Sequence, residues 1–357
     1  MKILTVFGTR SEILKLSLIV KVLDQHSEHL MMHTGETSDE SLSDVILCDL
    51  DLRSPDHDLR GAASADTVEQ ITAKIEPLIR EFAPTRILVC GGSKTAQAVV
   101  AAAGTSGVEI CQLDAGRRFF SDADLQRQLA ETASSILMTS TRRSSDNLFR
   151  EGIRPARVLL TGGPIREVLE SSADSIEASG ILTALNVRPF DFFLATVHRE
   201  EHLRDGNFLK VIDALAAVGE KFGKTVLVPA HPRLAARLQQ ARIPQPKQLR
   251  FLRSLGFFDF VKLEKNALAV VTDSKTVQEE CAILRVPNVT LGTVTDRIET
   301  IECGSNVVGG RNKEDVIRAV EIAIAQPAAW EAPDEYRQNV AQIVSNIVLG
   351  GYLSTKR

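Results

Sequence analysis

The sequence has no excess of basic side chains, because its 357 residues carry 42 Lys and Arg against 46 Asp and Glu. A chain with a formal net charge of −4 lacks the positive charge that neutralises a phosphate backbone, so we expect no nucleic-acid partner. Cysteine is also sparse, and the five cysteines include no pair with C-x-x-C spacing. This pattern argues against a disulfide framework or a zinc site and favours a reducing, cytoplasmic setting.

Long hydrophobic runs are missing as well. No uninterrupted apolar stretch approaches the ~20 residues that a membrane-spanning helix needs, so we expect no membrane segment. The remaining composition, with 44% hydrophobic and 25% charged residues, is typical of a soluble globular protein. At ~150 residues per domain, a chain of this length suggests two domains.

Short β-branched runs alternate with helix-length amphipathic segments along the first half of the chain. We expect strands over residues 2–7, 29–33, 86–90, 108–112, 135–138 and 157–160. Helices are expected over residues 12–25, from about 39, and over 67–82, 95–103, 125–132 and 144–151, with Pro77 kinking or breaking the third of them. The apolar strands do not alternate in polarity, so both faces of the sheet should be covered. This order of elements predicts a parallel, doubly wound α/β sheet.

The same pattern begins again in the second half. Strands are expected over residues 192–197, 225–229, 268–272, 288–291 and 306–308. Helices are expected over residues 171–185, 208–222, 234–241, 257–266, 277–284, 313–325 and 334–348. The chain therefore divides into two Rossmann-like domains, residues 1–169 and 170–333, followed by a last helix. Because ligands of open α/β sheets bind at the carboxyl ends of strands, site residues should follow the strands directly.

Several short motifs follow the expected strands. The first runs from Gly8-Thr9-Arg10 to Lys15. The others, in chain order, are His33-Thr34-Gly35, Asp114-Ala115-Gly116-x-Arg118, Asn147-Leu148-x-x-Glu151-Gly152, Thr161-Gly162-x-Pro164, Thr196-x-His198-Arg199-x-Glu201, Pro229-x-His231-Pro232, Thr272-Asp273-Ser274-x-x-x-Gln278-Glu279-Glu280 and Asp296-Arg297-Ile298-Glu299. In this order and spacing they resemble the motifs of the non-hydrolysing UDP-N-acetylglucosamine 2-epimerase family, of which the chain is identified as a divergent member.

The resemblance implies a fold and a reaction. The fold is two Rossmann-like domains of the glycosyltransferase-B type, with the C-terminal helix of about residues 334–357 packing back on the first domain. The reaction inverts C2 of UDP-GlcNAc or a related UDP-sugar by eliminating UDP across C1–C2 and adding it again, with no cofactor or metal. Such chemistry needs carboxylates at the sugar and a firm grip on the diphosphate. The resemblance also implies a UDP-sugar substrate and a homodimer.

The resemblance assigns roles to residues of this chain as well. The residues that it implies for catalysis are Lys15, Asp114, Arg127 and His198. The residues that it implies for binding the UDP-sugar are Arg10, Arg118, Arg199, His231, Ser274, Lys275, Gln278, Glu280 and Arg297. Among these, Glu280 would hold the ribose hydroxyls.

Two positions that carry carboxylates in the family do not carry them here. Gly92 replaces the Asp of a G-D-[TS] motif, and Ala123 replaces a Glu if the alignment to Arg127 has no gap. The third family carboxylate is Asp114, one methylene shorter than the family's Glu. Because a general acid or base contributes about 10²–10⁴-fold, we predict slower epimerisation than in an ordinary family member. The candidates to replace the lost groups are Asp122, Asp124, Glu36 and Glu131.

Two kinds of function therefore stay open. The first is a UDP-N-acetylglucosamine 2-epimerase-like enzyme with altered acid–base residues. The alternative is a non-epimerase on the same scaffold: a sugar-nucleotide hydrolase, a glycosyltransferase or a catalytically silent binding homologue. The number of carboxylates within reach of the sugar distinguishes the two.

Overall fold

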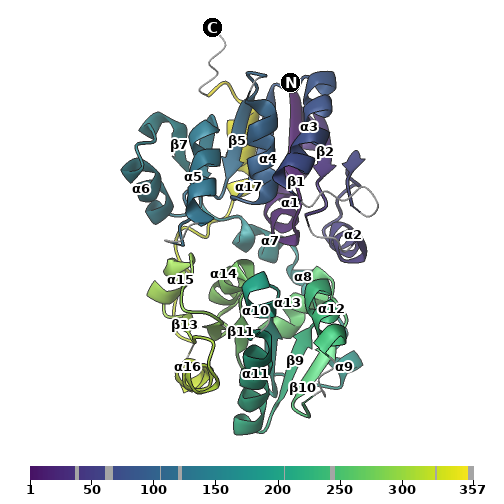
Figure 1. Cartoon of the computed structure of the whole chain (residues 1–357), viewed down its shortest axis with the longest axis vertical. Helices are drawn as coiled ribbons and strands as arrows, with labels where there is room; N and C mark the ends of the chain where they lie inside the picture. The colour runs from purple at the N-terminus through teal and green to yellow at the C-terminus, as the bar shows by residue number, and fades with distance from the viewer. Residues whose placement is uncertain are drawn as a thin grey trace. The chain divides into compact units, whose positions relative to one another are not determined.

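The computed structural model describes residues 1–36, 40–60, 67–104, 106–119, 123–204, 206–241, 246–325 and 328–352 of the chain. The chain folds into two compact units (Figure 1). Unit 1 comprises Met1–Glu170 with Glu335–Arg357, and unit 2 comprises Ser171–Asp334. Each unit contains one parallel sheet, which confirms the α/β prediction of two Rossmann-like domains.

Unit 1 is built on a seven-stranded parallel sheet with the order β3-β2-β1-β4-β5-β6-β7. Its strands are β1 (Lys2–Phe7), β2 (Glu28–His33), β3 (His57–Asp58), β4 (Arg86–Cys90), β5 (Glu109–Leu113), β6 (Ile136–Thr139) and β7 (Val158–Leu160). The central strands β4, β5 and β6 are buried along their whole length. This burial explains why their sequences do not alternate in polarity.

Helices connect these strands and pack in pairs. They are α1 (Arg10–His26), α2 (Glu40–Asp49), α3 (Val68–Phe82), α4 (Lys94–Ala103), α5 (Ala123–Ala133), α6 (Arg142–Arg150), the 3-10 turn η2 (Pro155–Arg157), α7 (Ile165–Ser171) and α17 (Val340–Leu349). Helix α3 packs against α4, and α1 packs against the C-terminal helix α17. The C-terminal helix thus belongs to unit 1, where it packs against the helix that follows the N-terminal strand.

Helix α3 is continuous through Pro77, so of the two expected alternatives, a kink or a break, the break does not occur. The helix begins with a capping box between Thr67 and Gln70, which satisfies two of its first N–H groups. Ile71 and Ile75 are fully buried on its inner face. Burial of such side chains contributes about 1.5–3 kcal/mol each, which together offsets the ~3 kcal/mol that an interior proline costs.

The C-terminal helix is shorter than expected. Helix α17 begins at Val340 rather than near residue 334, because Asn339 adopts a left-handed backbone with φ of 65°. Its C-terminus is held by Arg86 of β4, whose guanidinium donates to the carbonyls of Ile347 and Val348. This contact joins the end of the chain to the centre of the unit 1 sheet.

Unit 2 is built on a six-stranded parallel sheet with the order β10-β9-β8-β11-β12-β13. Its strands are β8 (Phe192–Thr196), β9 (Thr225–Pro229), β10 (Leu249–Leu252), β11 (Val270–Thr272), β12 (Asn288–Thr290) and β13 (Asn306–Val308). The sequence analysis missed β10, since this short edge strand pairs only with β9 and has no apolar run of its own. The core between this sheet and its helices includes Phe193, Phe208 and Leu215.

The helices of unit 2 include one segment that the sequence analysis assigned wrongly. They are α8 (Ala173–Ala178), α9 (Ile181–Leu185), α10 (Glu200–Leu203), α11 (Phe208–Phe222), α12 (Pro232–Ala241), α13 (Phe257–Lys265), α14 (Lys275–Leu284), α15 (Ile298–Glu302) and α16 (Lys313–Ala325). Residues 171–185 form the end of α7 and two short helices rather than one helix. The interruption lies at Ser179, which is extended with ψ of 126° and hydrogen-bonds Asp259 of α13.

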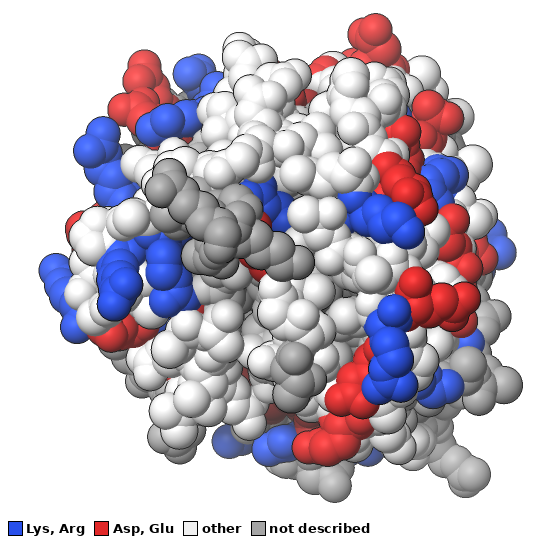
Figure 2. All heavy atoms as spheres, turned by 90° about the horizontal axis from the view of Figure 1, so that it is seen from above, with Lys and Arg blue, Asp and Glu red and all other residues white. Residues whose placement is uncertain are grey.

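The surface carries charges of both signs. On the face shown in Figure 2, basic and acidic side chains stand side by side around a largely uncharged centre. Within the described part of the chain, no helix is long and apolar enough to cross a membrane.

Candidate functional site

Polar groups of unit 1 gather where β1, β2 and β4 end. Gly8 follows β1, and a Cβ there would lie 2.2 Å from Thr34 Oγ1 and 2.5 Å from Thr95 Oγ1. No side chain fits this position without displacing both hydroxyls. Helix α1 then begins with a capping box, in which Thr9 Oγ1 accepts from the Glu12 N–H and Glu12 Oε2 accepts from the Gly8 N–H at 2.7 Å. The G-T-R motif is thus a tight strand-to-helix turn that holds Arg10 at the first position of α1.

A second carboxylate lies beside this turn. Glu36 Oε2 accepts hydrogen bonds from the Thr95 N–H at 3.3 Å and the Thr95 hydroxyl at 3.1 Å. Burial raises the pKa of Glu12 to about 7, and the charge of Glu36 adds to the shift. Glu36 thus contacts the N-terminal end of α4, two to three residues after Gly92. It therefore stays a candidate to replace the carboxylate that the family carries at position 92.

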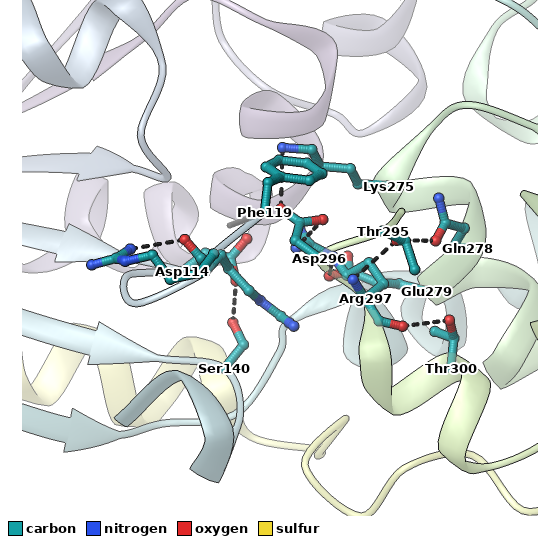
Figure 3. A network of polar contacts seen from close by, with 12 residues as sticks. Asp114, Phe119, Ser140, Lys275, Gln278, Glu279, Thr295, Asp296, Arg297 and Thr300 are labelled. Atoms are coloured by element: carbon teal, nitrogen blue, oxygen red, sulfur yellow. Dashed lines mark hydrogen bonds and ion pairs between the residues drawn. The ribbon is translucent and has the colours of Figure 1, made fainter. Parts of the chain in front are cut away.

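Lys15 and Asp114 form a buried ion pair in unit 1. The Lys15 Nζ lies 2.7 Å from Asp114 Oδ2, and both side chains are less than a tenth exposed. Asp114 Oδ1 accepts from Ser140 Oγ at 2.7 Å and from Arg117 Nε at 3.1 Å (Figure 3). Asp114 follows β5 directly with φ of 55°, a left-handed conformation that aspartate and asparagine tolerate better than most residues. The carboxylate is thus fixed at the strand end and faces two cations.

Arg118 and Glu131 are both engaged in an ion-pair network of unit 1. The Arg118 guanidinium pairs with Glu131 and with Glu151, at 2.7 Å from Nε to Glu151 Oε1. Glu131 Oε1 also accepts from the Gly116 N–H at 2.6 Å. Burial raises the pKa of Glu131, although the Arg118 hydrogen bond and charge oppose the shift. Since these contacts hold the turn after β5, Glu131 already has a structural role. The positive charge of Arg118 is balanced by the two carboxylates.

Gly92 lies against the side chain of Arg127. A Cβ at position 92 would meet Arg127 Cγ at 2.5 Å and Cδ at 3.0 Å. The Arg127 guanidinium in turn stacks 4.8 Å from the centre of the Phe119 ring. The aliphatic part of Arg127 therefore fills space where the family's aspartate would begin, so adding a carboxylate at Gly92 would displace Arg127.

The remaining candidate carboxylates are near the start of α5. Asp124 is buried, and its carboxylate accepts from the Phe119 N–H at 2.9 Å. Asp122 lies outside the described residues, as does the side chain of Ala123. Asp124 thus closes the loop before α5, and its replacement of a catalytic group stays a prediction.

Asp273 is the centre of the polar cluster in unit 2. It follows β11 directly, is fully buried, and accepts from the N–H groups of His198 and Arg199 at 3.0 and 2.9 Å. His198 Nδ1 lies 3.0 Å from Asp273 Oδ1, and His202 Nδ1 lies 2.9 Å from Oδ2. Burial alone would raise the pKa of Asp273, but the His198 ring and these donors lower it well below its usual range. Asp273 therefore stays charged and orients the loop after β8.

His231 joins this cluster from the end of β9. Its ring centre lies 5.8 Å from that of His198, with a 40° angle between the ring planes. The resemblance implied His198 for catalysis and His231 for binding the UDP-sugar, and the structure brings the two rings together. Arg199, on the same loop, is half-buried.

A second buried network surrounds Arg297. Its Nε lies 2.6 Å from Glu279 Oε1, and its Nη1 lies 3.2 Å from Asp296 Oδ1 (Figure 3). Gln278 is fully buried and accepts from the Thr295 hydroxyl at 2.6 Å. The guanidinium charge of Arg297 is thus balanced within unit 2, and Gln278 fixes the loop that carries it.

The start of α14 carries four of the predicted binding residues, Ser274, Lys275, Gln278 and Glu280. Ser274 is the N-cap of α14 without a side-chain cap hydrogen bond, and its own N–H donates to Thr272 Oγ1 at 2.8 Å. Lys275 is half-buried, with its Nζ 3.2 Å from Asp296 Oδ2. Glu280 is buried on the second turn of the same helix. A helix N-terminus with a neighbouring ammonium suits an anion such as a phosphate.

Sequence analysis missed Arg117, Ser140 and His202. Ser140 directly follows β6, as Asp114 follows β5, so its place after a strand was a signal that could have found it. His202 lies in α10, a four-residue helix too short to show a periodic pattern. Within the described residues, no group of His, Cys, Asp and Glu side chains is arranged to hold a metal ion.

Comparison with known proteins gives concordant results. The family model described as "UDP-N-acetylglucosamine 2-epimerase" matches residues 21–345. A UDP-N-acetylglucosamine 2-epimerase of Methanocaldococcus jannaschii is 29% identical over 99% of this chain and 100% of its own length. A UDP-2,3-diacetamido-2,3-dideoxy-D-glucuronate 2-epimerase of Pseudomonas aeruginosa is 28% identical, over 91% of this chain and 93% of its own. A crystal structure of the Methanocaldococcus jannaschii UDP-GlcNAc 2-epimerase with UDP-GlcNAc and UDP has a TM-score of 0.90, at 29% identity, and covers 98% of this chain and 100% of that one.

Proposed function

Because the chain belongs to the UDP-N-acetylglucosamine 2-epimerase family, we propose that it inverts C2 of UDP-GlcNAc or of a related UDP-sugar. In the proposed reaction a base removes the C2 proton while the C1–O bond to UDP breaks, which leaves UDP and a glycal. Return of a proton to the other face of C2, with UDP adding back at C1, gives the epimer. Both steps balance without a metal or a redox cofactor.

The buried Lys15–Asp114 pair is the observation that carries this proposal. It supplies a carboxylate and an ammonium 2.7 Å apart, where the resemblance expects the acid–base chemistry on the sugar. Ser140 and Arg117 restrict the Asp114 carboxylate further. A fixed carboxylate can take a proton without first reorganising, which is what a general base requires.

The basic groups of unit 2 support binding of the diphosphate. Arg199, His198 and His231 come from the loops after β8 and β9, and Lys275 from the start of α14. Hydrogen bonds from charged donors to phosphate oxygens are stronger than neutral ones, so such a set suits a diphosphate. Glu280 and Arg10 keep their proposed roles at the ribose and the nucleotide.

Gly92 favours the alternative of a non-epimerase on the same scaffold. The stem of Arg127 fills the space at this position, so no carboxylate can stand there in the present packing. A protein that eliminates UDP but returns the proton poorly would release UDP and glycal, and addition of water across C1–C2 of that glycal would complete a hydrolysis. A sugar-nucleotide hydrolase, a glycosyltransferase and a silent binding homologue share the UDP-sugar ligand but not C2 inversion.

Homodimer formation and a cytoplasmic location belong to the proposal too. Leu125 and Leu129 are 62% and 63% exposed on one face of α5. Two such leucines one helical turn apart suit a contact with a second copy of the chain. All five cysteines are free thiols, which fits a reducing cytoplasm.

Calorimetry tests the ligand class. We expect UDP and UDP-GlcNAc to bind, and Arg199→Met to weaken binding by about tenfold or more, the scale of a hydrogen bond between charged groups. Arg204→Met is the matched control, because Arg204 directly follows α10 a few residues after Arg199, is exposed, and pairs with the exposed Glu200. Absence of heat and of a thermal shift at millimolar UDP would exclude the proposed ligand.

A further inference from the structure

One buried carboxylate in unit 2 is shared by two imidazole rings. Asp273 is fully buried and ionised, so its oxygens can only accept hydrogen bonds. The Nδ1 atoms of His198 and His202 lie 3.0 and 2.9 Å from its two oxygens. Each ring must therefore carry a proton on Nδ1, which leaves Nε2 of each ring as the position that gains or lacks a second proton.

The two rings differ sharply in burial. The side chain of His202 is fully buried, and that of His198 is 37% exposed. His202 Nε2 has no hydrogen-bond partner among the described residues, and Glu201 Oε1 lies 3.7 Å from it. A single carboxylate balances one imidazolium, and burial penalises the charged form of a histidine. The second proton therefore belongs on His198, while His202 remains neutral.

Other charged groups lie near the two rings, but Asp273 is the carboxylate that contacts both Nδ1 atoms. The Glu201 carboxylate is shared, since it lies 3.4 Å from Arg311 Nη2 and 3.8 Å from Arg199 Nη1. The His231 ring, from the end of β9, lies 5.8 Å from the His198 ring and is tilted by 40° to it. The charged and titratable groups around the two rings are thus Asp273, Glu201, Arg199, Arg311 and His231.

We propose that His202 positions His198 through Asp273, and that His198 takes up a proton when the diphosphate of a UDP-sugar binds. His202 and the backbone hold the Asp273 carboxylate in place, Asp273 fixes the Nδ1–H form of His198, and His198 Nε2 then meets the anion. The proton comes from solvent and forms an N–H bond that donates to a phosphate oxygen. This inference rests on the proposed function, because the anion is the diphosphate of that ligand.

Calorimetry with UDP-GlcNAc in buffers of different ionisation enthalpy measures the proton. UDP-GlcNAc is the probe because its diphosphate is a diester with no proton to lose near neutral pH, whereas UDP itself titrates there. For the unmodified protein we expect uptake of up to one proton per ligand, and we expect this uptake to depend on pH across the range in which imidazole side chains ordinarily titrate. His198→Asn should bind more weakly and take up none.

Two variants of His202 separate positioning from mere packing. His202→Asn keeps an N–H donor for Asp273 and cannot titrate, so the pH midpoint of proton uptake should stay close to that of the unmodified protein. His202→Leu removes the donor and leaves Asp273 more attractive to an imidazolium. The midpoint should then rise by about one pH unit, the scale of one hydrogen bond to a charged group. A purely structural role would lower the melting temperature without moving the midpoint.

The outcomes are distinct. Failure of UDP-GlcNAc to bind the unmodified protein would overturn the proposed function and this inference with it. Binding without proton uptake, uptake that persists in His198→Asn, or an unmoved midpoint in folded His202→Leu would overturn the inference alone. If His202→Leu does not fold, nitrogen-15 spectra of the unmodified protein decide: His202 should remain the neutral Nδ1–H form across the pH range in which His198 titrates, and titration of His202 instead would contradict the proposal.

Discussion

Substitution of Asp114 by asparagine should lower turnover of UDP-GlcNAc by about 10²-fold or more, the usual loss on removing a general acid or base. Asparagine matches the shape of the side chain and tolerates the left-handed backbone at this position, where φ is 55°. The substitution thus removes the charge and the proton-accepting oxygen while changing little else. Lys15, 2.7 Å away in the buried pair, would lose its counter-charge at the same time.

Ser140→Ala is the matched control for this variant. It removes one hydrogen bond to the same carboxylate, at 2.7 Å, but leaves the Asp114 charge and its contacts with Lys15 and Arg117 in place. We expect a smaller loss of turnover than in Asp114→Asn, because the carboxylate itself remains and only one hydrogen bond to it, worth ~1.5–3 kcal/mol for a charged acceptor, is removed. Unchanged turnover in a folded Asp114→Asn protein would remove Asp114 from the mechanism.

The largest expected effect on stability comes from Arg86. Its side chain is 1% exposed, pairs with Glu109 at 2.7 Å, and donates to the carbonyls of Ile347, Val348 and Gly350. Arg86→Met would leave the Glu109 carboxylate buried without this partner and the end of α17 without its donor. Breaking a buried pair on one side costs about 3–5 kcal/mol, so unfolding of unit 1 should require correspondingly less denaturant.

Two comparisons make the Arg86 test specific. Arg80→Met changes an exposed arginine of α3 and should leave the free energy of unfolding within ~0.5 kcal/mol of its original value. The double variant Arg86→Met with Glu109→Leu removes both charges and should recover part of the loss. Hydrogen exchange should accelerate in α17 of Arg86→Met, and protection equal to that of the unmodified protein would show that this contact does not hold the helix.

The sequence was informative where local pattern decides structure. Helix α11 and strand β9 have the bounds expected from their apolar spacing, because a buried helix face and a buried parallel strand each leave a clear signature. A break at Pro77 was one of two expected alternatives and does not occur, since burial of α3 outweighs its proline. Strand β10 was missed, since an edge strand takes its stability from its neighbour. Packing of this kind depends on contacts between distant segments of the folded chain, so a short stretch of sequence does not predict it.

The candidate site shows the same division. Asp114 could be predicted because it directly follows a strand, but its pairing with Lys15, 99 residues earlier, required the fold. Arg118 was expected at the sugar, and its two carboxylate partners, Glu131 and Glu151, come from α5 and the end of α6. Which cations already have partners depends on contacts between distant segments, so sequence position alone does not reveal it.

Incubation with UDP-GlcNAc in deuterated water tests the proposed reaction most directly, because only removal and return of the C2 proton can place deuterium on that carbon. If the protein is an epimerase, the recovered UDP-sugar should carry deuterium at C2. The missing carboxylates should make this incorporation slow, and Asp114→Asn should slow it further. Incubation should be long enough to detect a rate ~10⁴-fold below that of an ordinary general acid–base enzyme. Retention of the original hydrogen at C2, in protein saturated with UDP-GlcNAc and with no UDP or glycal released, would contradict the proposed reaction and leave a binding protein on an epimerase scaffold.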